Sequence, residues 1–380
     1  MTKSITVCFF GYPNQSYSRN HILIDGLHQN GARIVSCTDS SGLFFVRFWR
    51  LFKTFWPLRR QVNVIFVQFP GHLNMPIAWL LGKLFGQPVI FDAFVSLYDT
   101  YVFDRRIAGQ GSLKAKFYWW VDKLACHLAD HITLDTHAHI RYFVRTFKLP
   151  RTKFSRLPVG GDDSVFKPRS VIHHLKSNVI IEFHGMFTRL HGAEVFVKVA
   201  KKLENHKHLQ FWLIGDSWNY RLPIKFYFKL RPKTMTYWPK LPVGQLARQV
   251  AQADISIAHL GPTQKARMVL TNKMFHALAS RVALIAGDNP ATKEFLIDRQ
   301  NCLFVNMYDE ADLSQKILYL SRHPQLRRTL ALNGYNLHQQ KFTNQKLALE
   351  LLQIIRKHLL HVSPFDGPNS WPHPHKKSIL

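Results

Sequence analysis

Short apolar runs alternate along the chain with longer stretches in which apolar residues recur every three or four positions. The short runs are rich in β-branched and aromatic residues and end near glycine or proline, which is typical of buried strands, whereas the longer stretches are typical of helices. In the first half of the chain this pattern predicts strands at 5–10, 33–36, 62–69, 88–91 and 131–134. It predicts helices at 18–29, 75–85 and 113–129.

The same alternation starts again after Pro168. The second series predicts strands at 178–183, 209–214, 255–258, 282–286 and 302–305. It predicts helices at 193–203, 272–280, 313–322, 325–333 and 345–360. Strands that alternate with helices favour parallel βαβ units, and such sheets bind ligands beyond the carboxyl ends of their strands. The fold class we expect is therefore α/β, with two facing Rossmann-like, doubly wound domains and a cleft between them.

The domain organisation follows from this pattern and from a length of 380 residues, which favours two domains. We place an N-terminal domain at 1–168, a C-terminal domain at 169–344, a C-terminal helix at 345–362 and a tail at 363–380. The tail holds several Pro, Gly and His residues without periodicity, so we expect it to be disordered. Met1 leads into polar residues and no apolar stretch is long enough to span a bilayer, so we expect neither a secretory signal nor a spanning helix.

The net charge of the chain indicates what kind of partner it binds. There are 51 Lys and Arg residues against 23 Asp and Glu residues, which gives a formal net charge of +28. A charge so far from zero favours an anionic partner, and nucleic acid, anionic lipid and phosphorylated substrates all qualify. The four cysteines are scattered without a CxxC pair. That spacing argues against a zinc site or a disulfide framework and is typical of a reducing compartment, so we expect a cytoplasmic location.

Several segments, in their order and spacing, resemble the group 1 (family 4) glycosyltransferases of the GT-B fold. The segments are Gly11–Asn20, Phe91–Phe94, Leu157–Asp162, His184–Gly192, Asn272–Ala279 and Asn289–Glu294. The resemblance covers about residues 5–345. It implies a GT-B fold with the acceptor on the N-terminal domain and a nucleotide sugar on the C-terminal domain. Because the nucleotide sugar is a substrate, no cofactor is implied.

The resemblance implies that His184–Gly192 holds the donor phosphates and that Asn272–Ala279 is the nucleotide-binding helix. Glycosyl transfer expels a nucleoside diphosphate, so fixed cations and backbone N–H groups aimed at its phosphates favour the transition state. Glycine permits close approach of the backbone, and Arg suits phosphate oxygens through its planar fork. The alternative for Arg189 and Lys265 is that they are solvated loop residues without a role in binding. The donor-binding candidates are Gly185, Arg189, His191, Lys265, Asn272, Lys273 and His276.

Four positions of the donor site depart from the family's pattern, and the family's N-domain His beside the sugar is replaced in the segment Asp92–Phe94. Members carry two glutamates eight positions apart at the donor site, where this chain has Met268 and His276. The phosphate loop has Met186 and His191 in place of Arg and Lys. A neutral imidazole at 276 would accept one hydrogen bond from a ribose hydroxyl, and its titration near neutrality would make affinity depend on pH. The alternatives are a histidine packed against the sheet and, for the whole chain, a catalytically inactive relative that binds sugar nucleotides or acts as a scaffold.

Three carboxylates are candidates for catalysis, namely Asp92, Asp104 and Glu294. Asp92 and Asp104 follow the fourth predicted strand, so we expect them to orient or deprotonate an acceptor hydroxyl. We expect Glu294 to face the sugar, where it would bind hydroxyls or stabilise positive charge. The alternatives are loop carboxylates that pair with the many cations and a Glu294 that serves a helix dipole.

The first strand–helix loop and the end of the third predicted strand supply a second set of candidates. We expect Gly11, Tyr17 and Arg19 to form a loop that meets an acceptor or its phosphate. His72 is a candidate for the same contact, with a histidine at the rim of the cleft as the alternative. The sequence has no convincing DxD dyad and no His/Cys cluster, so we expect no metal site.

Gly42–Arg60 reads GLFFVRFWRLFKTFWPLRR and is dense in Phe and Trp with interleaved Arg and Lys. Trp and Phe favour the bilayer interface and basic groups meet anionic lipid, so this stretch predicts a membrane-docking helix, with an ordinary buried helix as the alternative. The stretches 113–123 and 225–240 have a similar composition. Aromatic residues beside basic ones also suit single-stranded nucleic acid, although no RRM, KH or helix-turn-helix signature accompanies them.

The combined expectation is a metal-independent hexosyltransferase, peripheral on the cytoplasmic face of the cell membrane. It would move a sugar from a UDP- or GDP-linked donor to a lipid-linked or phosphorylated glycan acceptor, in bacterial surface polysaccharide or lipopolysaccharide synthesis. Retention of the anomeric configuration is implied by the resemblance alone. A basic protein that binds nucleic acid on a duplicated Rossmann scaffold is the remote alternative.

Overall fold

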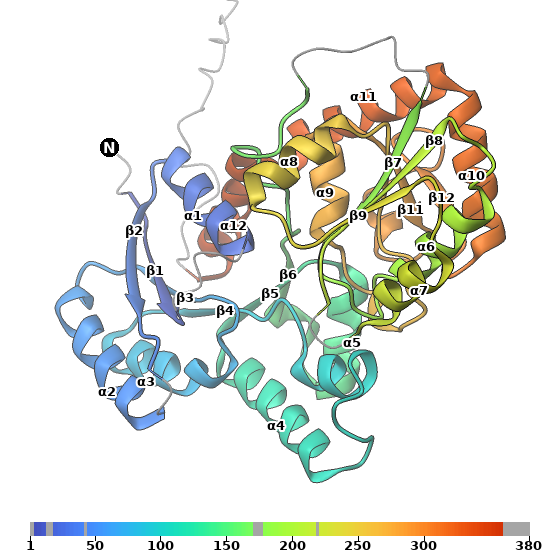
Figure 1. Ribbon diagram of the computed structural model, residues 1–380. Helices are drawn as coiled ribbons and strands as arrows, with labels where there is room; N and C mark the ends of the chain where they lie inside the picture. The colour runs from blue at the N-terminus through green and yellow to red at the C-terminus, as the bar shows by residue number, and fades with distance from the viewer. Residues whose placement is uncertain (1–3, 13–17, 42–43, 170–177, 218–219, 360–380) are drawn as a thin grey trace, which may run out of the picture.

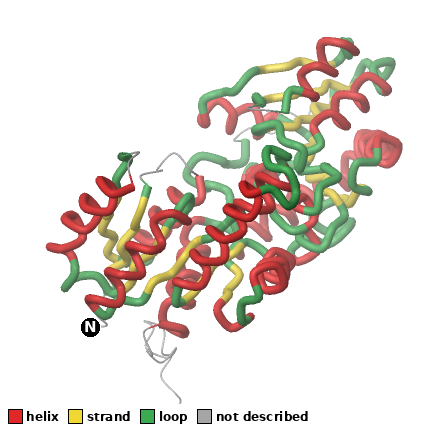
Figure 2. The backbone as a smooth tube through the Cα atoms, turned by 90° about the horizontal axis from the view of Figure 1, so that it is seen from below, coloured by secondary structure: helices red, strands yellow, loops and turns green. Residues whose placement is uncertain are grey.

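The computed structural model describes residues 4–12, 18–41, 44–169, 178–217 and 220–359, which form two domains side by side (Figure 1). Each domain has a six-stranded sheet in which neighbouring strands are parallel. Figure 2 shows the two lobes from below, with their helices packed around the strands. The expected α/β class with two Rossmann-like, doubly wound domains is confirmed.

The N-terminal sheet has the strand order β2-β1-β3-β4-β5-β6. Its strands are β1 (Thr6–Gly11), β2 (Arg33–Thr38), β3 (Val64–Val67), β4 (Val89–Asp92), β5 (His131–Leu134) and β6 (Phe154–Arg156). Its helices are α1 (Ser18–Gln29), α2 (Phe44–Phe55), α3 (Met75–Phe85), α4 (Leu113–Leu128) and α5 (His137–Phe147). The inner strands β1, β3, β4 and β5 are buried at every position, as expected for a parallel sheet covered on both faces.

The C-terminal sheet has the strand order β12-β11-β10-β7-β8-β9. Its strands are β7 (Val179–His184), β8 (Leu209–Ile214), β9 (Met235–Trp238), β10 (Ile255–Ile257), β11 (Ala283–Gly287) and β12 (Leu303–Val305). The helices of this half are α6 (Ala193–Lys202), α7 (Leu222–Leu230), α8 (Val243–Gln252), α9 (Asn272–Ala279), α10 (Glu310–Arg322), α11 (Pro324–Lys341) and α12 (Asn344–Leu359). Both sheets therefore present the carboxyl ends of their strands along one edge, where ligands are expected.

The bounds of β5, β8, α1 and α3 agree with the sequence prediction. The pattern does not predict the short strands β6 and β9 or the helices α5, α7 and α8. The helix predicted at 325–333 is also too short, because α11 continues to Lys341. The reason is Gly334, whose place in the helix brings α11 close to α9: a Cβ there would lie 2.8 Å from the Leu278 side chain. This glycine permits helix–helix contact and does not end the helix.

The last helix returns to the N-terminal domain. Figure 1 shows α12 beside α1, and the two helices pack together. A Cβ on Gly26 of α1 would lie 1.9 Å from the carbonyl oxygen of Asn344, so the helices touch through their backbones. The Asn344 amide also donates to Asp25 at 2.7 Å. One buried apolar cluster, which includes Phe9, Phe275 and Leu351, consequently runs from one domain into the other.

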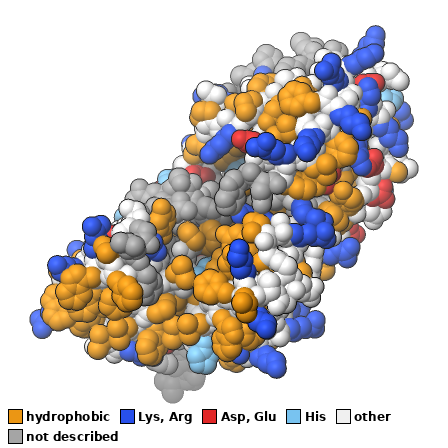
Figure 3. Space-filling view, turned by 60° about the horizontal axis from the view of Figure 1, so that its bottom comes forward, with side chains coloured by type: hydrophobic (Ala, Val, Ile, Leu, Met, Phe, Trp, Pro, Cys, Tyr) orange, Lys and Arg blue, Asp and Glu red, His pale blue; other side chains and the backbone are white. Residues whose placement is uncertain are grey.

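The helices α2, α3 and α4 carry many apolar side chains that face solvent. Helix α3 contacts both α2 and α4, so the three form one surface. Figure 3, which brings the lower side of Figure 1 forward, shows hydrophobic side chains gathered over this part of the N-terminal domain, with Lys and Arg among them. We define the apolar face as the exposed residues Phe45, Trp49, Trp56, Leu84, Leu113, Phe117 and Trp120. Within the described ranges, no helix is both long enough and apolar enough to cross a bilayer.

Candidate active site

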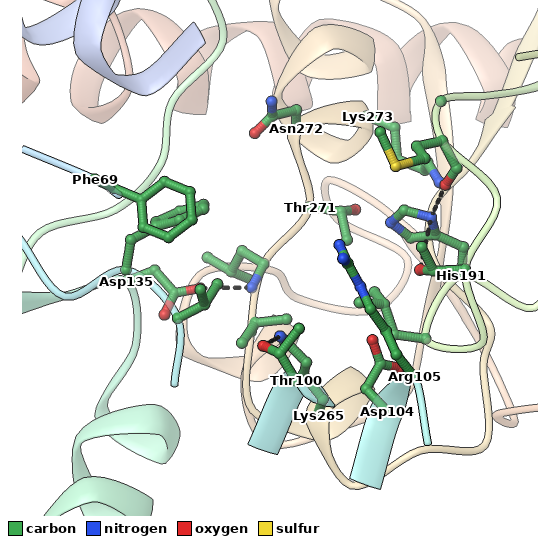
Figure 4. A pocket seen from close by; sticks show the side chains of 18 of the residues that line it. Phe69, Thr100, Asp104, Arg105, Asp135, His191, Lys265, Thr271, Asn272 and Lys273 are labelled. Atoms are coloured by element: carbon green, nitrogen blue, oxygen red, sulfur yellow. Dashed lines mark hydrogen bonds between the residues drawn. The ribbon is translucent and has the colours of Figure 1, made fainter. Parts of the chain in front are cut away.

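A cavity of about 460 Å³ lies between the domains, at the carboxyl ends of the strands. Phe69, Phe94 and Asp135 line it from the segments that follow β3, β4 and β5. Gly185 and Lys265 line it from the segments that follow β7 and β10. Figure 4 shows Asn272 and Lys273 at one end of the cavity and Thr100 and Asp104 at the opposite end. The cavity therefore occupies the position that the doubly wound topology assigns to a ligand.

Lys273 is the most isolated cation of the cavity. It lies in the first turn of α9 and is 3% exposed, and its Nζ has no hydrogen-bond partner among the described residues. Its Nζ lies over the ring of Phe183, 4.2 Å from the centroid. Burial lowers the pKa of Lys273 to about 7, and the Glu182 carboxylate opposes that shift. A buried ammonium group without a partner is a place where an anion gains much binding energy.

Gly185 lies beside that lysine in the wall of the cavity. Its φ angle is +117°, which favours glycine, and a Cβ on it would lie 3.5 Å from the Lys273 Cε. Its N–H donates to Ile214 at 2.9 Å within the sheet. The expectation that this N–H binds phosphate is therefore corrected, because the group is already used. The φ angle of Gly185 is the feature that requires glycine at this position.

Lys265 bridges the two domains. It lies in a short helical turn of the C-terminal domain, is 5% exposed, and its Nζ donates to the Thr100 hydroxyl of the N-terminal domain at 2.5 Å. It also lies 3.9 Å from the Asp99 carboxylate. Burial lowers the pKa of Lys265, and Asp99 and Asp104 oppose that shift. Lys265 lines the cavity as expected, but its ammonium is engaged across the domain boundary.

The acidic partners of Lys265 are themselves buried. Asp104 lines the cavity, and its Oδ1 has no hydrogen-bond partner within the described part of the chain. Burial raises the pKa of Asp104, while Lys265, Arg105 and Arg189 oppose the rise. Burial likewise raises the pKa of Asp99. Asp104 is thus a carboxyl group with a free acceptor oxygen and a raised pKa beside the cavity, which suits proton transfer with a hydroxyl group.

Two histidines of the predicted donor site line the cavity. His191 hydrogen-bonds the carbonyl of Met186, and burial together with the Lys273 charge lowers its pKa well below the usual range. His276 stacks on Phe166 with ring centroids 3.6 Å apart, and burial lowers its pKa well below the usual range. Both rings are therefore neutral near pH 7. Asn272 also lines the cavity, and its amide lies 3.4 Å from the Ser18 hydroxyl.

Arg189 is not among the residues that line the cavity. It is a half-buried residue of the loop His184–Gly192, close enough to Asp104 to oppose the rise of that carboxyl's pKa. The expectation that Arg189 contacts the donor phosphate directly therefore has no geometric support. Arg105 takes a more central place, because it lines the cavity from the N-terminal domain and extends into it in Figure 4.

Asp92 and Arg19 form a buried ion pair away from the cavity. The Arg19 guanidinium donates to both carboxylate oxygens of Asp92, at 2.7 and 2.8 Å, and Thr133 donates to the same carboxylate at 2.7 Å. Arg19 also donates to the carbonyl of Pro158 at 2.8 Å. Neither residue lines the cavity. This geometry contradicts the expectation that Asp92 handles an acceptor hydroxyl and that Arg19 meets a phosphate.

Glu294 joins the two domains instead of facing the cavity. Its carboxylate accepts hydrogen bonds from the backbone N–H groups of His137 at 3.0 Å and Ala138 at 2.9 Å, in the first turn of α5. It also lies 3.3 Å from Arg156. A carboxylate at a helix N-terminus satisfies unpaired donors and the helix dipole. The prediction that Glu294 contacts the sugar is therefore wrong. The alternative, a carboxylate at a helix N-terminus, agrees with the structure, and the helix belongs to the other domain.

Of the remaining N-terminal candidates, the described residues Gly11 and His72 do not line the cavity. Gly11 has a φ angle of +120°, and a Cβ on it would lie 2.7 Å from the Asn74 amide, so it serves close packing. Tyr17 falls outside the described residues. His72 is buried, with Nε2 3.2 Å from the Val95 carbonyl, and burial lowers its pKa to about 4. The structure corrects both expectations for His72, because it neither faces the cavity nor lies at a rim.

Sequence reasoning missed Asp135, which follows the end of β5 and lines the cavity. One carboxylate oxygen accepts from the N–H of Leu270 at 2.8 Å, and the other lies 2.8 Å from His139 Nδ1. Its position directly after a parallel strand is the signal that could have identified it. As for metals, the described residues hold no group of three or more His, Cys, Asp or Glu side chains that could bind an ion.

Sequence comparison with protein families gives two matches that together span most of the chain. Residues 5–160 match the glycosyl transferase 4-like domain, and residues 193–353 match a family described as glycosyl transferase-like. The first match covers the N-terminal sheet, and the second covers the C-terminal sheet except β7, which lies in the gap between the two matches. No curated protein sequence matches this chain.

Solved structures share the two-domain fold at low sequence identity. A sucrose-phosphate synthase from Thermosynechococcus elongatus superposes with a TM-score of 0.68 at 16% identity, over 93% of this chain and 98% of that one. Anabaena HepE, in complex with UDP and glucose, superposes with a TM-score of 0.69 at 11% identity, over 93% of this chain and 100% of that one. A glycosyltransferase from Rickettsia africae gives a TM-score of 0.66 at 12% identity, over 94% and 99% of the two chains.

Proposed function

Because the chain belongs to the group 1 glycosyltransferases of the GT-B fold, we propose that it transfers a sugar from a UDP- or GDP-linked donor to a lipid-linked or phosphorylated glycan acceptor. The observation that carries the proposal is the buried Lys273 ammonium, which lines the cavity without a hydrogen-bond partner in the described chain. HepE binds UDP in a structure of the same fold.

The cavity has the chemistry that departure of a nucleoside diphosphate requires. Negative charge grows on the leaving phosphate as the sugar–oxygen bond breaks, and a cation already held in place stabilises that charge. Lys273 is such a cation, and the N-terminus of α9 adds the positive end of a helix dipole. Arg105 lines the same cavity from the N-terminal domain. These groups supply the stabilisation without a metal ion.

Asp104 is the residue we assign to the acceptor. Of the three carboxylates predicted to act in catalysis, Asp104 alone lines the cavity, and burial raises its pKa. A carboxylate with a raised pKa accepts a proton from a hydroxyl more readily than an exposed one does. We expect Asp104→Asn to lower turnover while UDP affinity stays within about twofold. Retention of configuration remains an expectation from the family.

The apolar face supports docking on an anionic bilayer. Phe45 is 85% exposed and Trp120 is 60% exposed, and Lys123 lies 5.3 Å from the Trp120 ring. Arg59 lies 4.3 Å from the ring of Trp56. Neither α2 nor α3 contains an acidic residue. Exposed Trp and Phe beside cations suit the headgroup region of anionic lipid, so we place the protein on the cytoplasmic face of the membrane, near a lipid-linked acceptor of surface polysaccharide or lipopolysaccharide synthesis.

The aromatic and basic stretch 225–240 does not belong to the apolar face. Residues Phe226 and Tyr227 of α7 pack against the core of the C-terminal domain, while Phe228 is exposed. Helix α7 packs on α6 and not on the helices of the apolar face. We therefore assign membrane contact to α2, α3 and α4 and leave α7 out of it.

The decisive experiment measures hydrolysis or transfer with UDP-, GDP- and ADP-linked hexoses, with and without vesicles that contain the lipid fraction of a bacterial membrane. Turnover with one donor class supports the proposal. Binding of nucleotide without turnover of any donor supports the alternative of an inactive relative, for which the replacement of the family's glutamate by Met268 is the relevant observation. Strong, salt-dependent oligonucleotide binding without nucleotide affinity supports the nucleic-acid alternative.

A further inference from the structure

A chain of buried hydrogen bonds runs from the centre of the C-terminal sheet to the cavity. The Ser256 hydroxyl on β10 donates to one oxygen of Glu182 on β7. The other oxygen of Glu182 lies 2.8 Å from Nδ1 of His184, on the same strand. Nε2 of His184 lies 3.0 Å from Nδ1 of His276 on α9. Both histidines line the cavity.

The order of donors and acceptors along this chain sets the tautomers. Glu182 accepts from Ser256, and a carboxylate has only acceptors to offer His184. In the neutral imidazole of His184, Nδ1 therefore carries the proton and Nε2 carries the lone pair. Nδ1 of His276 must then donate to that lone pair, which leaves Nε2 of His276 as an acceptor. The state of His276 is thus decided by Glu182, with which it shares no contact.

The surroundings of His276 keep this arrangement. The titratable groups packed around it are His184 on β7, Lys273 on its own helix and His338 on α11, and together with burial they lower its pKa well below the usual range. Phe166 covers one ring face at a centroid distance of 3.6 Å. Nε2 is buried and has no hydrogen-bond partner among the residues that the structure describes. An acceptor atom in this state calls for a donor from a ligand.

We propose that Glu182 and His184 are positioning residues, which hold His276 as the Nδ1–H tautomer so that its Nε2 accepts a hydrogen bond from a ribose hydroxyl of the donor nucleotide. This inference rests on the proposed function, because it assumes a nucleotide in the cavity. It explains how the chain works with a histidine at a position where the family has glutamate. Both oxygens of a glutamate carboxylate accept hydrogen bonds. A neutral imidazole accepts on one nitrogen only, and its tautomer determines which nitrogen that is.

The first test needs no ligand. In protein labelled with 15N-histidine, two-bond 1H–15N correlations distinguish Nδ1–H from Nε2–H rings, and loss of signals in His184→Gln and His276→Gln assigns them. We expect both rings as Nδ1–H in the wild type, and we expect Glu182→Leu to convert His276 to a mixture or to Nε2–H. An Nε2–H ring for His276 in the wild type overturns the proposal.

The second test measures UDP affinity by titration calorimetry, with GDP as the second probe if UDP does not bind. Glu182→Leu should weaken binding about tenfold, which corresponds to one hydrogen bond of about 1.4 kcal/mol. Glu182→Gln should recover most of the affinity, because an amide oxygen still accepts from His184. Ser256→Ala is the matched control, since it disturbs the same buried cluster but leaves Glu182 in place, and it should bind UDP like the wild type.

A double-mutant cycle separates positioning from structure. In a His276→Glu background the side chain at this position accepts a hydrogen bond whatever the tautomer of His184, so Glu182→Leu should no longer affect UDP affinity. An equal loss in both backgrounds overturns the proposal, as does unchanged affinity of Glu182→Leu in the wild-type background. If neither nucleotide binds the wild type, the proposed function fails, while the tautomer measurement still decides the state of His276.

Discussion

Lys265 and Thr100 come from different domains and meet at 2.5 Å, ammonium to hydroxyl, inside the cavity. Two further contacts join the loop that carries Lys265 to the segment after β5: the Leu270 N–H donates to Asp135 at 2.8 Å, and the Thr136 hydroxyl donates to the carbonyl of Met268. The loop that carries Lys265 is therefore held against the N-terminal domain at several points. The cleft between the domains is closed at this end, and the cavity has walls from both.

Replacement of Lys265 by Met should destabilise the protein by about 3–5 kcal/mol at pH 7, because it leaves Asp99 and Asp104 buried without their cation. Burial already raises the pKa of both carboxyls, and loss of Lys265 raises them further. The folded variant then binds more protons than its unfolded chain, so its deficit should shrink as the pH falls toward 5. Urea unfolding at pH 7 and 5 measures this. Lys293→Met, at an exposed pair with Asp288, should change little.

Lys273→Ala should weaken UDP binding by about 10- to 100-fold, the range expected for one charged hydrogen-bond donor to phosphate. Thermal stability should hold or improve, because the change removes a buried ammonium without a hydrogen-bond partner in the described structure. Titration calorimetry and the unfolding temperature measure the two effects. Lys293→Ala, away from the cavity, is the control. Unchanged affinity in the Lys273 variant removes this residue from the donor site.

The pKa of Lys273 makes both stability and binding depend on pH. Burial lowers this pKa from 10.5 to about 7, so between these values the unfolded chain binds more protons than the folded one. The contribution of Lys273 to the free energy of unfolding therefore rises with pH across that window. A bound diphosphate favours the ammonium form, so UDP should bind with proton uptake at pH 8, and affinity should fall as the pH rises.

Calorimetry of UDP binding at pH 8, in buffers with different ionisation enthalpies, measures the proton uptake. Lys273→Met is the matched variant, since it keeps the length of the side chain without the amine. Proton uptake of the same size in that variant contradicts the assignment, because the proton would then come to another group.

The buried pair of Arg19 and Asp92 should act on stability and not on the donor. Asp92→Ala leaves the guanidinium buried without its carboxylate, so we expect a loss of about 3–5 kcal/mol. UDP affinity of the folded variant should stay within about twofold of the wild type, because neither residue lines the cavity. Urea unfolding and calorimetry test the two parts. A large loss of UDP affinity with intact stability returns Asp92 to the active site.

Membrane docking through the apolar face should depend on Phe45 and Trp49. Phe45→Ser together with Trp49→Ser removes two exposed aromatic side chains of α2 and should lower binding to phosphatidylglycerol vesicles at least about tenfold. Phe228→Ser, an exposed aromatic change on α7, is the control. Vesicle sedimentation at rising salt measures the charge contribution, which screening should weaken. Equal binding of all variants, or none by the wild type, contradicts the docking proposal.

Parts of the candidate site could be predicted from the chain alone. Gly185, Lys265 and Lys273 follow strand ends or begin a helix, and these positions place a residue at the ligand edge of a parallel sheet whatever the rest of the fold does. All three line the cavity. The alternation of apolar runs likewise determined two α/β domains, because burial on both faces of a sheet requires nearly continuous apolar strands.

Other assignments depended on partners far away in the chain. Asp92 meets an arginine 73 positions away, and Glu294 meets the first turn of α5, 157 positions away, so the sequence near each carboxylate holds no sign of its role. Short segments such as β6 are strands only because β5 lies beside them. Three residues carry too little pattern to predict a strand on their own.

The sequence by itself determined the layers of this protein and the edge at which its chemistry lies, since both follow from local periodicity and chain direction. Only the tertiary structure decided which polar side chains face the cavity. A carboxylate at a strand end is satisfied by whichever cation, N–H group or hydroxyl packs against it, and that choice is made by contacts between distant segments. The same reason turns His276, an isolated departure in the sequence, into the end of a buried hydrogen-bond chain that starts at Ser256.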